Sequence, residues 1–258
     1  MTVVSRWRPP RLWRASLWLA GVVVAVFARL RVSGGLPPGW SGGPLLLAAN
    51  HLGLADPVVL AAAARRLGVA PRVMATAGVF RAPVLGWFMR SCGHVRVDRR
   101  PGAAAAAVDA AAVALRGGSV LLVYPEGRIG LDPGLWPERG KTGVARLALT
   151  LGVPVVPVAQ WGAQELLPYG APRRVVRTLL RALWRRPVAR VWFGPPVDLS
   201  GLSLSVTGDA ARATERIMDA VTAGLVPLRA GEPQGPRWVD PTRPVTSERS
   251  RQAPVHRR

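Results

Sequence analysis

Short apolar runs alternate with longer segments of helical periodicity along most of the chain. The apolar runs predict strands at residues 45–49, 72–76, 94–97, 119–124, 153–159 and 190–193. Helical patterns lie between or after them, at residues 57–67, 83–91, 103–116, 142–150 and 210–225. This alternation predicts an α/β domain with a largely parallel central sheet flanked by helices, and we place that domain at residues 33–228.

The two ends of the chain show other patterns. Residues 1–32 contain an uncharged apolar run, Ala15 to Ala28, with arginines on both sides, and predict an N-terminal membrane-associating segment. Its fourteen residues are fewer than the roughly 20 that cross a bilayer, so a helix in the interface, a helix packed on the core and a tilted span all stay open. Residues 229–258 are rich in Pro and Arg and predict a disordered basic tail.

The clearest amphipathic pattern covers residues 173–187. One half of the helical wheel carries the apolar side chains of Val175, Val176, Leu179, Leu180, Leu183 and Trp184, and the other carries Arg174, Arg177, Arg181 and Arg185. A basic helix with an apolar face suits an anionic membrane surface. The same pattern also fits a surface helix that packs its apolar side on the sheet and leaves its arginines in water.

The net charge of +21 is typical of proteins that bind nucleic acid or anionic membranes. Among the 35 basic residues, however, Lys141 is the sole lysine, so part of the excess is a compositional bias towards arginine. The charge is concentrated in residues 1–31 and 173–190. No helix-turn-helix or zinc-finger pattern is present, so we expect an anionic membrane surface as the partner and no specific nucleic acid.

Cysteine and histidine usage narrows the chemistry. Cys92 is the single cysteine, which excludes an internal disulfide and fits a packed position better than a catalytic thiol. No clustered His/Cys spacing indicates a metal site, and His94 and His256 stand apart from one another. No signal-peptide cleavage pattern follows the first apolar run, so we expect a peripheral or monotopic protein at the cytoplasmic face of the cell membrane.

The most informative segment is Asn50 to Asp56, where His51 precedes Asp56 by five positions directly after a predicted strand. A neutral imidazole can accept a proton from a hydroxyl near pH 7, and a carboxylate on its other ring nitrogen fixes the tautomer. The pair therefore predicts a general base with its orienting acid. Asp56 also precedes Pro57 at a helix start, so a simple N-cap is the alternative reading.

Three later segments, taken with the first, resemble the conserved blocks of the glycerolipid acyltransferases, the family of 1-acyl-glycerol-3-phosphate acyltransferases. Residues 93–99 (Gly-His-Val-Arg-Val-Asp-Arg) resemble the second block, 124–128 (Tyr-Pro-Glu-Gly-Arg) the third and 153–158 (Val-Pro-Val-Val-Pro-Val) the fourth. The order matches that of the family. The third block departs from the usual Phe-Pro-Glu-Gly-Thr-Arg-Ser, because its threonine and serine are missing and Arg128 comes one place early.

The resemblance implies acyl transfer from acyl-CoA or acyl carrier protein to the hydroxyl of a lysophospholipid, with no cofactor besides the acyl donor. His51 and Asp56 are the expected catalytic residues. Substrate-binding residues are expected in the blocks and just after the third: Asn50, Arg99, Glu126, Gly127, Arg128 and Lys141. Arginine suits an acceptor phosphate because its planar fork donates two parallel charge-assisted bonds.

Two other functions fit parts of the sequence less well. Residues 39–43 (Gly-Trp-Ser-Gly-Gly) satisfy the Gly-x-Ser-x-Gly pattern of a serine hydrolase, but that turn needs a strand before it and a helix after it, and prolines and a strand flank this one. A non-enzymatic protein that binds membrane or nucleic acid through its charge has no need of His51 and Asp56. Acylation of another lysolipid or of a lipid-linked acceptor stays open, since the third block is altered.

Overall fold

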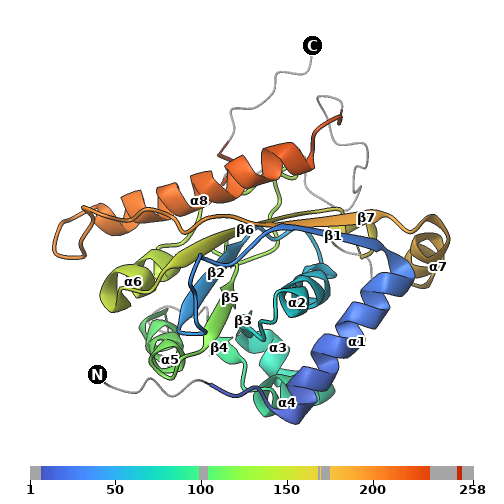
Figure 1. Ribbon diagram of the computed structural model, residues 1–258, viewed down its shortest axis with the longest axis horizontal. Coiled ribbons are helices and arrows are strands. Elements are labelled where there is room, and N and C mark those ends of the chain that lie inside the picture. Colours follow the sequence, from blue (N-terminus) through green and yellow to red (C-terminus); the bar gives the residue numbers. More distant parts are fainter. Residues whose placement is uncertain (1–6, 99–103, 168, 170–174, 233–248, 252–258) are drawn as a thin grey trace.

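The computed structural model describes residues 7–98, 104–167, 169, 175–232 and 249–251. These residues form a seven-stranded sheet in the order β1-β7-β6-β2-β5-β3-β4 (Figure 1). Its strands are β1 (Arg29–Gly34), β2 (Leu45–Ala49), β3 (Arg72–Thr76), β4 (Val95–Val97), β5 (Val120–Val123), β6 (Val155–Trp161) and β7 (Val188–Phe193). All described neighbours run parallel except β6 and β7, which are antiparallel. The predicted α/β class with a largely parallel sheet is confirmed.

Helices cover both faces of the sheet (Figure 1). The described helices are α1 (Arg11–Phe27), α2 (Asp56–Arg66), α3 (Ala77–Arg81), α4 (Pro83–Ser91), α5 (Ala104–Arg116), α6 (Gly143–Leu151), α7 (Val175–Arg185) and α8 (Asp209–Leu228), with a 3-10 turn η1 (Ala163–Glu165). Residues of α1, α2 and α7 join the apolar cluster on one face, whereas α5, α6 and α8 join the cluster on the other.

The central strand β2 shows how the two layers are held together. Leu45, Leu47 and Ala49 belong to the cluster under α1 and α2, while Leu46 and Ala48 belong to the cluster under α5 and α6. All five side chains are buried. A parallel strand covered on both faces loses the apolar–polar alternation, which is why this stretch reads as a continuous apolar run.

Strand β1 was not predicted, and it crosses the domain boundary placed after residue 32. Its sequence, Arg-Leu-Arg-Val-Ser-Gly, carries only two apolar side chains, which are half-buried, because β1 is an edge strand paired with β7 alone. The short helix α3 was not predicted either, and its five residues carry too little periodicity to identify it. The N-terminal segment is thus continuous with the sheet.

Parts of the predicted disordered tail are ordered. The guanidinium carbon of Arg229 lies 4.1 Å from the ring centroid of Trp136 and 4.2 Å from that of Trp161, and its Nη1 donates to the carbonyl of Gly134. Ser250 forms an antiparallel bridge with Glu138. The prediction of disorder is therefore wrong for residues 229–232 and 249–251; residues 233–248 and 252–258 lie outside the described part of the chain.

Helix α1 uses only one side for packing. Trp13, Leu17, Ala20 and Val24 are buried, and the indole of Trp13 donates to the carbonyl of Pro71 at 3.1 Å. Trp18 and Leu19, on the opposite side, are more than half exposed. Within the described ranges, none of the helices is both long enough and apolar enough to cross a membrane.

Candidate active site

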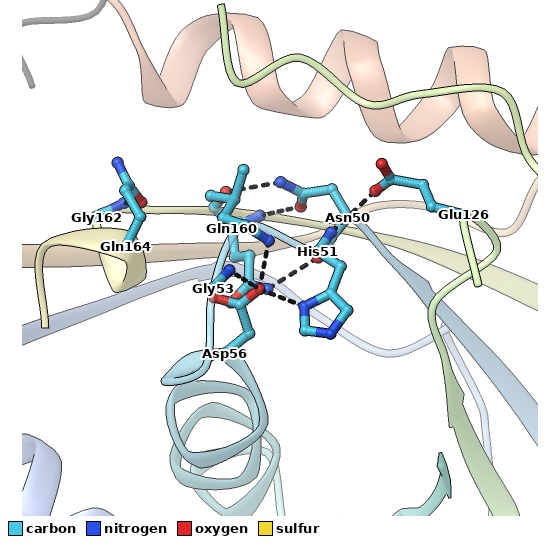
Figure 2. Close-up of polar contacts among 9 residues, drawn as sticks. Asn50, His51, Gly53, Asp56, Glu126, Gln160, Gly162 and Gln164 are labelled. Carbon is cyan, nitrogen blue, oxygen red and sulfur yellow. Dashed lines mark hydrogen bonds and ion pairs between the residues drawn. The ribbon is translucent and has the colours of Figure 1, made fainter. Parts of the chain in front are cut away.

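The predicted pair of His51 and Asp56 is assembled in the structure (Figure 2). Nδ1 of His51 lies 2.8 Å from Oδ2 of Asp56. The same carboxylate oxygen accepts the backbone N–H groups of Leu52 and Gly53, so Asp56 also holds the conformation of the loop between strand β2 and helix α2. Ala55, not Asp56, occupies the N-cap, and no side chain caps this helix. The N-cap reading of Asp56 is wrong.

This geometry determines which nitrogen of His51 can act as a base. With Nδ1–H donated to the buried carboxylate, Nε2 carries the lone pair that is directed away from Asp56. The histidine side chain is 16% exposed, so a substrate can reach the imidazole while most of the ring stays out of water. A base positioned in this way can accept a proton from an attacking hydroxyl.

Tyr124 supports the imidazole from one side. The two rings stack with centroids 4.0 Å apart and planes at 16°. Tyr124 directly follows β5, which pairs with β2 through Ala48 and Val123, and His51 follows β2 by two residues. Burial, and next the charge of Asp56, raise the pKa of the Tyr124 phenol well above its usual range, so the phenol is neutral. The carboxylate of Asp56 therefore determines which edge of the His51 ring faces it, and the stacked ring of Tyr124 determines the orientation of the imidazole plane.

Glu126 in the third block holds the backbone of the first block. Its Oε1 accepts the N–H of His51 at 2.9 Å, and its Oε2 accepts the N–H of Glu138 at 3.0 Å. The N–H of Gly130 in turn donates to the carbonyl of His51 at 2.8 Å. Glu126 is 1% exposed. The side chain of Glu126 thus holds the backbone of the histidine loop, and its predicted part in substrate binding stays a prediction.

Burial has the largest effect on the pKa of the Glu126 carboxyl group. Burial raises the pKa of its carboxyl group from about 4.5 to about 8, and the N–H groups of Glu138 and His51 limit that rise. Gly130 is tightly packed against this carboxylate, because a Cβ on Gly130 would lie 2.7 Å from Oε2 of Glu126. A larger residue at position 130 would therefore displace the group that holds His51.

Asn50 is bonded internally. Its side chain donates from Nδ2 to the carbonyl of Gln160 at 3.1 Å and accepts the N–H of Gln160 at 2.8 Å, while the Gln160 amide donates to the carbonyl of Asn50 (Figure 2). Both residues are fully buried. The side chain of Asn50 thus extends the β2–β6 ladder beyond its end, and its predicted contact with substrate stays a prediction.

Gly127, Arg128 and Lys141 lie together beside this loop. Lys141 donates its N–H to the carbonyl of Pro125, and its side chain lies over Gly127: a Cβ on Gly127 would lie 3.1 Å from Cδ and Cε of the lysine. Gly127 also has φ +69°, which favours glycine. Arg128 makes a forked interaction with the buried Glu138, at 3.0–3.2 Å, and about a third of its side chain stays exposed.

The second block approaches the same end of the sheet. Strand β4 is parallel to β3, and β2, β5 and β3 are parallel to one another, so the carboxyl ends of all four strands lie along one edge. Arg99, the predicted phosphate ligand, lies two residues after β4 but outside the described residues. Its contact therefore stays a prediction. The fourth block is the buried strand β6, which pairs with β2.

The remaining motifs have structural explanations. Residues 39–43 lie in the connection between β1 and β2 and are followed by a strand, so the serine-hydrolase reading fails. Cys92 is buried, and burial raises the pKa of its thiol. Nδ1 of His94 accepts the N–H of Val73 at 3.0 Å, and burial lowers the pKa of this imidazole to about 4. His256 lies outside the described residues.

Sequence reasoning missed two residues that shape the site, Tyr124 and Gln160. The signal for Tyr124 was its position at the end of a buried strand just before Pro-Glu-Gly, and for Gln160 its position two residues after the fourth block. Both positions become informative only when the order of the strands is known. The amino-acid sequence does not by itself specify the order of the strands in the sheet.

The chain is similar to known acyltransferases. A chloroplastic 1-acyl-sn-glycerol-3-phosphate acyltransferase of Brassica napus is 27% identical over 188 residues, which cover 72% of this chain and 51% of the relative. One from Arabidopsis thaliana is 26% identical over 177 residues, covering 67% and 47%. The chain thus spans about half the length of these curated relatives.

A solved structure and a family model extend the comparison. The 1-acyl-sn-glycerophosphate acyltransferase of Thermotoga maritima has the same fold, with a TM-score of 0.63 and 21% identity over 86% of this chain and 81% of that one. The acyltransferase family model matches residues 29–161, which is just over half of the 258 residues and includes His51, Asp56 and the four sequence blocks. The chain belongs to the acyltransferase family.

Proposed function

We propose that this protein transfers a fatty acyl group from acyl-CoA or acyl carrier protein to the hydroxyl of 1-acyl-glycerol-3-phosphate, which gives phosphatidic acid. The observation that carries the proposal is the His51–Asp56 pair, whose geometry leaves Nε2 of a part-exposed imidazole as a base. The names of the two curated relatives support the choice of acceptor.

In this reaction the acceptor hydroxyl attacks the thioester carbonyl while Nε2 of His51 takes its proton. The resulting tetrahedral centre collapses with cleavage of the carbon–sulfur bond. The imidazolium returns the proton to the departing thiolate, so the products are an ester and a free thiol. Asp56 stabilises the imidazolium during the step and remains ionised. No covalent acyl-enzyme intermediate and no cofactor are required.

We assign the acceptor phosphate to the basic groups beside the third block. Lys141 lies over the bare backbone of Gly127, and Arg128 presents the exposed part of a guanidinium whose other side is held by Glu138. Arg99 is expected to contribute a further cation. Loss of a charge-assisted bond to phosphate typically weakens binding by about 10-fold or more.

The test is incubation of the purified protein with radiolabelled acyl-CoA, or with acyl carrier protein, and a panel of lysolipids. We expect labelled phosphatidic acid, with monoacylglycerol as a poor acceptor. The Lys141→Ala variant should raise KM for the phosphate-bearing acceptor and leave KM for the acyl donor unchanged, with Arg116→Ala on α5 as the matched exposed control. Equal acylation of phosphate-free acceptors would contradict the proposal.

A second acceptor class is favoured by one observation. Arg128, which stands one place earlier than in the usual third block, is engaged with Glu138 and so has less freedom to bind phosphate. This favours another lysolipid or a lipid-linked acceptor in the same reaction. The lysolipid panel separates the two possibilities, since it includes acceptors with and without a terminal phosphate.

We also propose that the protein is peripheral or monotopic at the cytoplasmic face of the membrane and that α1 contributes to its attachment. The support is the outward side of α1, which carries exposed apolar residues: Leu12, Trp18, Leu19, Val22, Val23 and Val26. Removal of residues 1–28 should weaken association with liposomes in a flotation assay. Unchanged flotation would contradict attachment through α1.

A further inference from the structure

Helix α7 leaves most of its apolar side in solvent. Trp184 is 90% exposed, Val176 72% and Leu180 62%. Among the residues of this helix Ala182 alone is buried. Of the six side chains on the apolar half of the wheel, Val175 and Leu179 are half-buried and the other four are exposed, so the helix packs only one border of its apolar face on the protein. Large apolar side chains exposed side by side on one helix indicate an interaction surface.

On the exposed face of α7 the apolar side chains lie next to one another, and the arginines lie along one border of them. At about 100° per residue, Leu183, Val176, Leu180 and Trp184 follow one another around the wheel, and Arg177, Arg181 and Arg185 continue from the tryptophan side. Ala182 and the half-buried Val175 lie on the remaining side, towards the protein. This gives an apolar ridge bordered by a row of cations. A helix lying at a headgroup boundary has this arrangement.

The ridge is fixed relative to α1. Arg186, the residue after α7, donates from Nη2 to the carbonyl of Ala25 in α1 at 2.6 Å, and its own N–H donates to the carbonyl of Ala182. Figure 1 shows α7 beside the C-terminal end of α1. The exposed apolar residues of α1 and of α7 thus occur on two helices that are bonded to each other.

This surface is linked to the active site through α2. Helix α1 packs on α2, whose first residue is Asp56, and Leu54 in the His51 loop is itself half exposed. Buried side chains of α1, α2 and α7 all belong to one continuous apolar cluster. Contact of α7 with a lipid surface would therefore hold the His51 side of the sheet close to that surface.

We propose that α7 is an anionic-lipid contact, separate from attachment through α1, and that its arginines make membrane binding depend on lipid charge. An anionic bilayer fits better than a protein partner because α1 and α7 contain no acidic residue and the cations border one apolar ridge. Glu165 is an acidic neighbour; burial raises its pKa, and the charge of Arg181 opposes that rise. The proposal does not rest on the proposed function, since it concerns binding without substrate.

The test measures partition of the full chain into vesicles of phosphatidylcholine, with and without phosphatidylglycerol, by flotation. Each arginine near an anionic surface strengthens binding by about 5-fold, so the Arg177→Gln, Arg181→Gln, Arg185→Gln variant should bind the anionic vesicles roughly 100-fold more weakly. Its binding to phosphatidylcholine should hardly change. Arg116→Gln on α5, on the opposite face of the sheet, is the matched control.

A second variant tests the apolar ridge. Leu180→Ser with Trp184→Ser should weaken binding to both kinds of vesicle, whereas Val113→Ser, at a residue of α5 that is also two-thirds exposed, should not. Circular dichroism melting checks that each variant folds. Wild-type binding that is independent of phosphatidylglycerol would overturn the proposal. So would variants that bind vesicles normally but lose self-association in gel filtration, which would assign the ridge to a second copy of the chain.

Discussion

Two buried carboxyl groups hold His51, and they do so in different ways. Asp56 uses one oxygen, Oδ2, for the imidazole and for two N–H groups of its own loop. Glu126 uses both oxygens for backbone N–H groups, one in the first block and one at Glu138. Asp56 therefore acts both on the imidazole ring and on the backbone of its loop, whereas the two oxygens of Glu126 act on the backbone.

The comparison shows that a residue of a sequence block can shape the site through contacts with the backbone of another block. Both side chains are almost completely buried, with 0% exposure for Asp56 and 1% for Glu126. Their loss should nevertheless differ in kind. Loss of Asp56 should affect the proton transfer, and loss of Glu126 should affect the stability and placement of the loop. The predictions below test this division.

The largest effect is expected at the residue that both carboxylates hold. His51→Ala removes the general base and should lower kcat by about 10²- to 10⁴-fold, while the fold and the membrane binding persist. Steady-state kinetics with acyl-CoA and lysophosphatidic acid, together with circular dichroism, measure both. A folded His51→Ala variant that keeps more than half of the wild-type rate would show that His51 is not the general base. The two carboxyl groups that hold it would then have no catalytic role to compare.

Asp56→Asn tests the ring side of the comparison. An asparagine can present an N–H to Nδ1 and so stabilise the wrong tautomer, and it cannot stabilise the imidazolium. We expect kcat to fall by about 10²-fold with a much smaller change in KM. Asp109→Asn, at an exposed position of α5, is the control. A fall confined to KM would assign Asp56 to substrate binding instead.

The pairing of His51 with Asp56 could be predicted from sequence because the two residues are only five positions apart. The fold class could also be predicted, since buried strands such as Leu45–Ala49 and strong helices such as Ala104–Arg116 have clear patterns. Strand β1 could not, because its edge position leaves only two half-buried apolar residues.

The remainder of the site depends on strand order. Gln160 reaches Asn50 across 110 positions because β6 pairs with β2, and Glu126 reaches His51 across 75 because β5 pairs with β2 on its other side. Nothing in the local pattern of residues specifies these neighbours. For this reason the sequence could indicate Asn50 and Glu126 as site residues but not the backbone groups that they bind.

Glu126→Gln tests the contacts that Glu126 makes with the backbone of the histidine loop and of Glu138. The glutamine can accept one of the two N–H groups but presents its own N–H to the other, so we expect a loss of stability of about 1–3 kcal/mol and a fall in activity of about 10-fold. Because the pKa of Glu126 is raised to about 8 in the folded protein, the folded state binds the proton more tightly than the unfolded chain does. Its stabilising contribution is therefore complete below about pH 4.5 and is lost as the pH rises through 8.

Urea denaturation of both proteins between pH 5 and pH 9 measures this dependence. The stability difference between wild type and Glu126→Gln should narrow as the pH rises. A difference that widens with pH would mean that the carboxylate, and not the carboxyl group, holds the two N–H groups throughout the range. Glu126 would then resemble Asp56 more closely than we infer.

The smallest effect is expected at Tyr124, which lies against the ring that Asp56 orients. Within the described residues its hydroxyl has no hydrogen-bond partner, although it is buried, so Tyr124→Phe removes a polar group without breaking a bond. We expect activity within about 3-fold of wild type and stability that is equal or higher by about 1 kcal/mol. Tyr124→Ala, by contrast, removes the stacked ring at 4.0 Å and should lower kcat by about 10-fold. If Tyr124→Phe were as inactive as Tyr124→Ala, the hydroxyl would be part of the reaction, and the orientation of His51 would depend on a third polar group beside the two carboxylates.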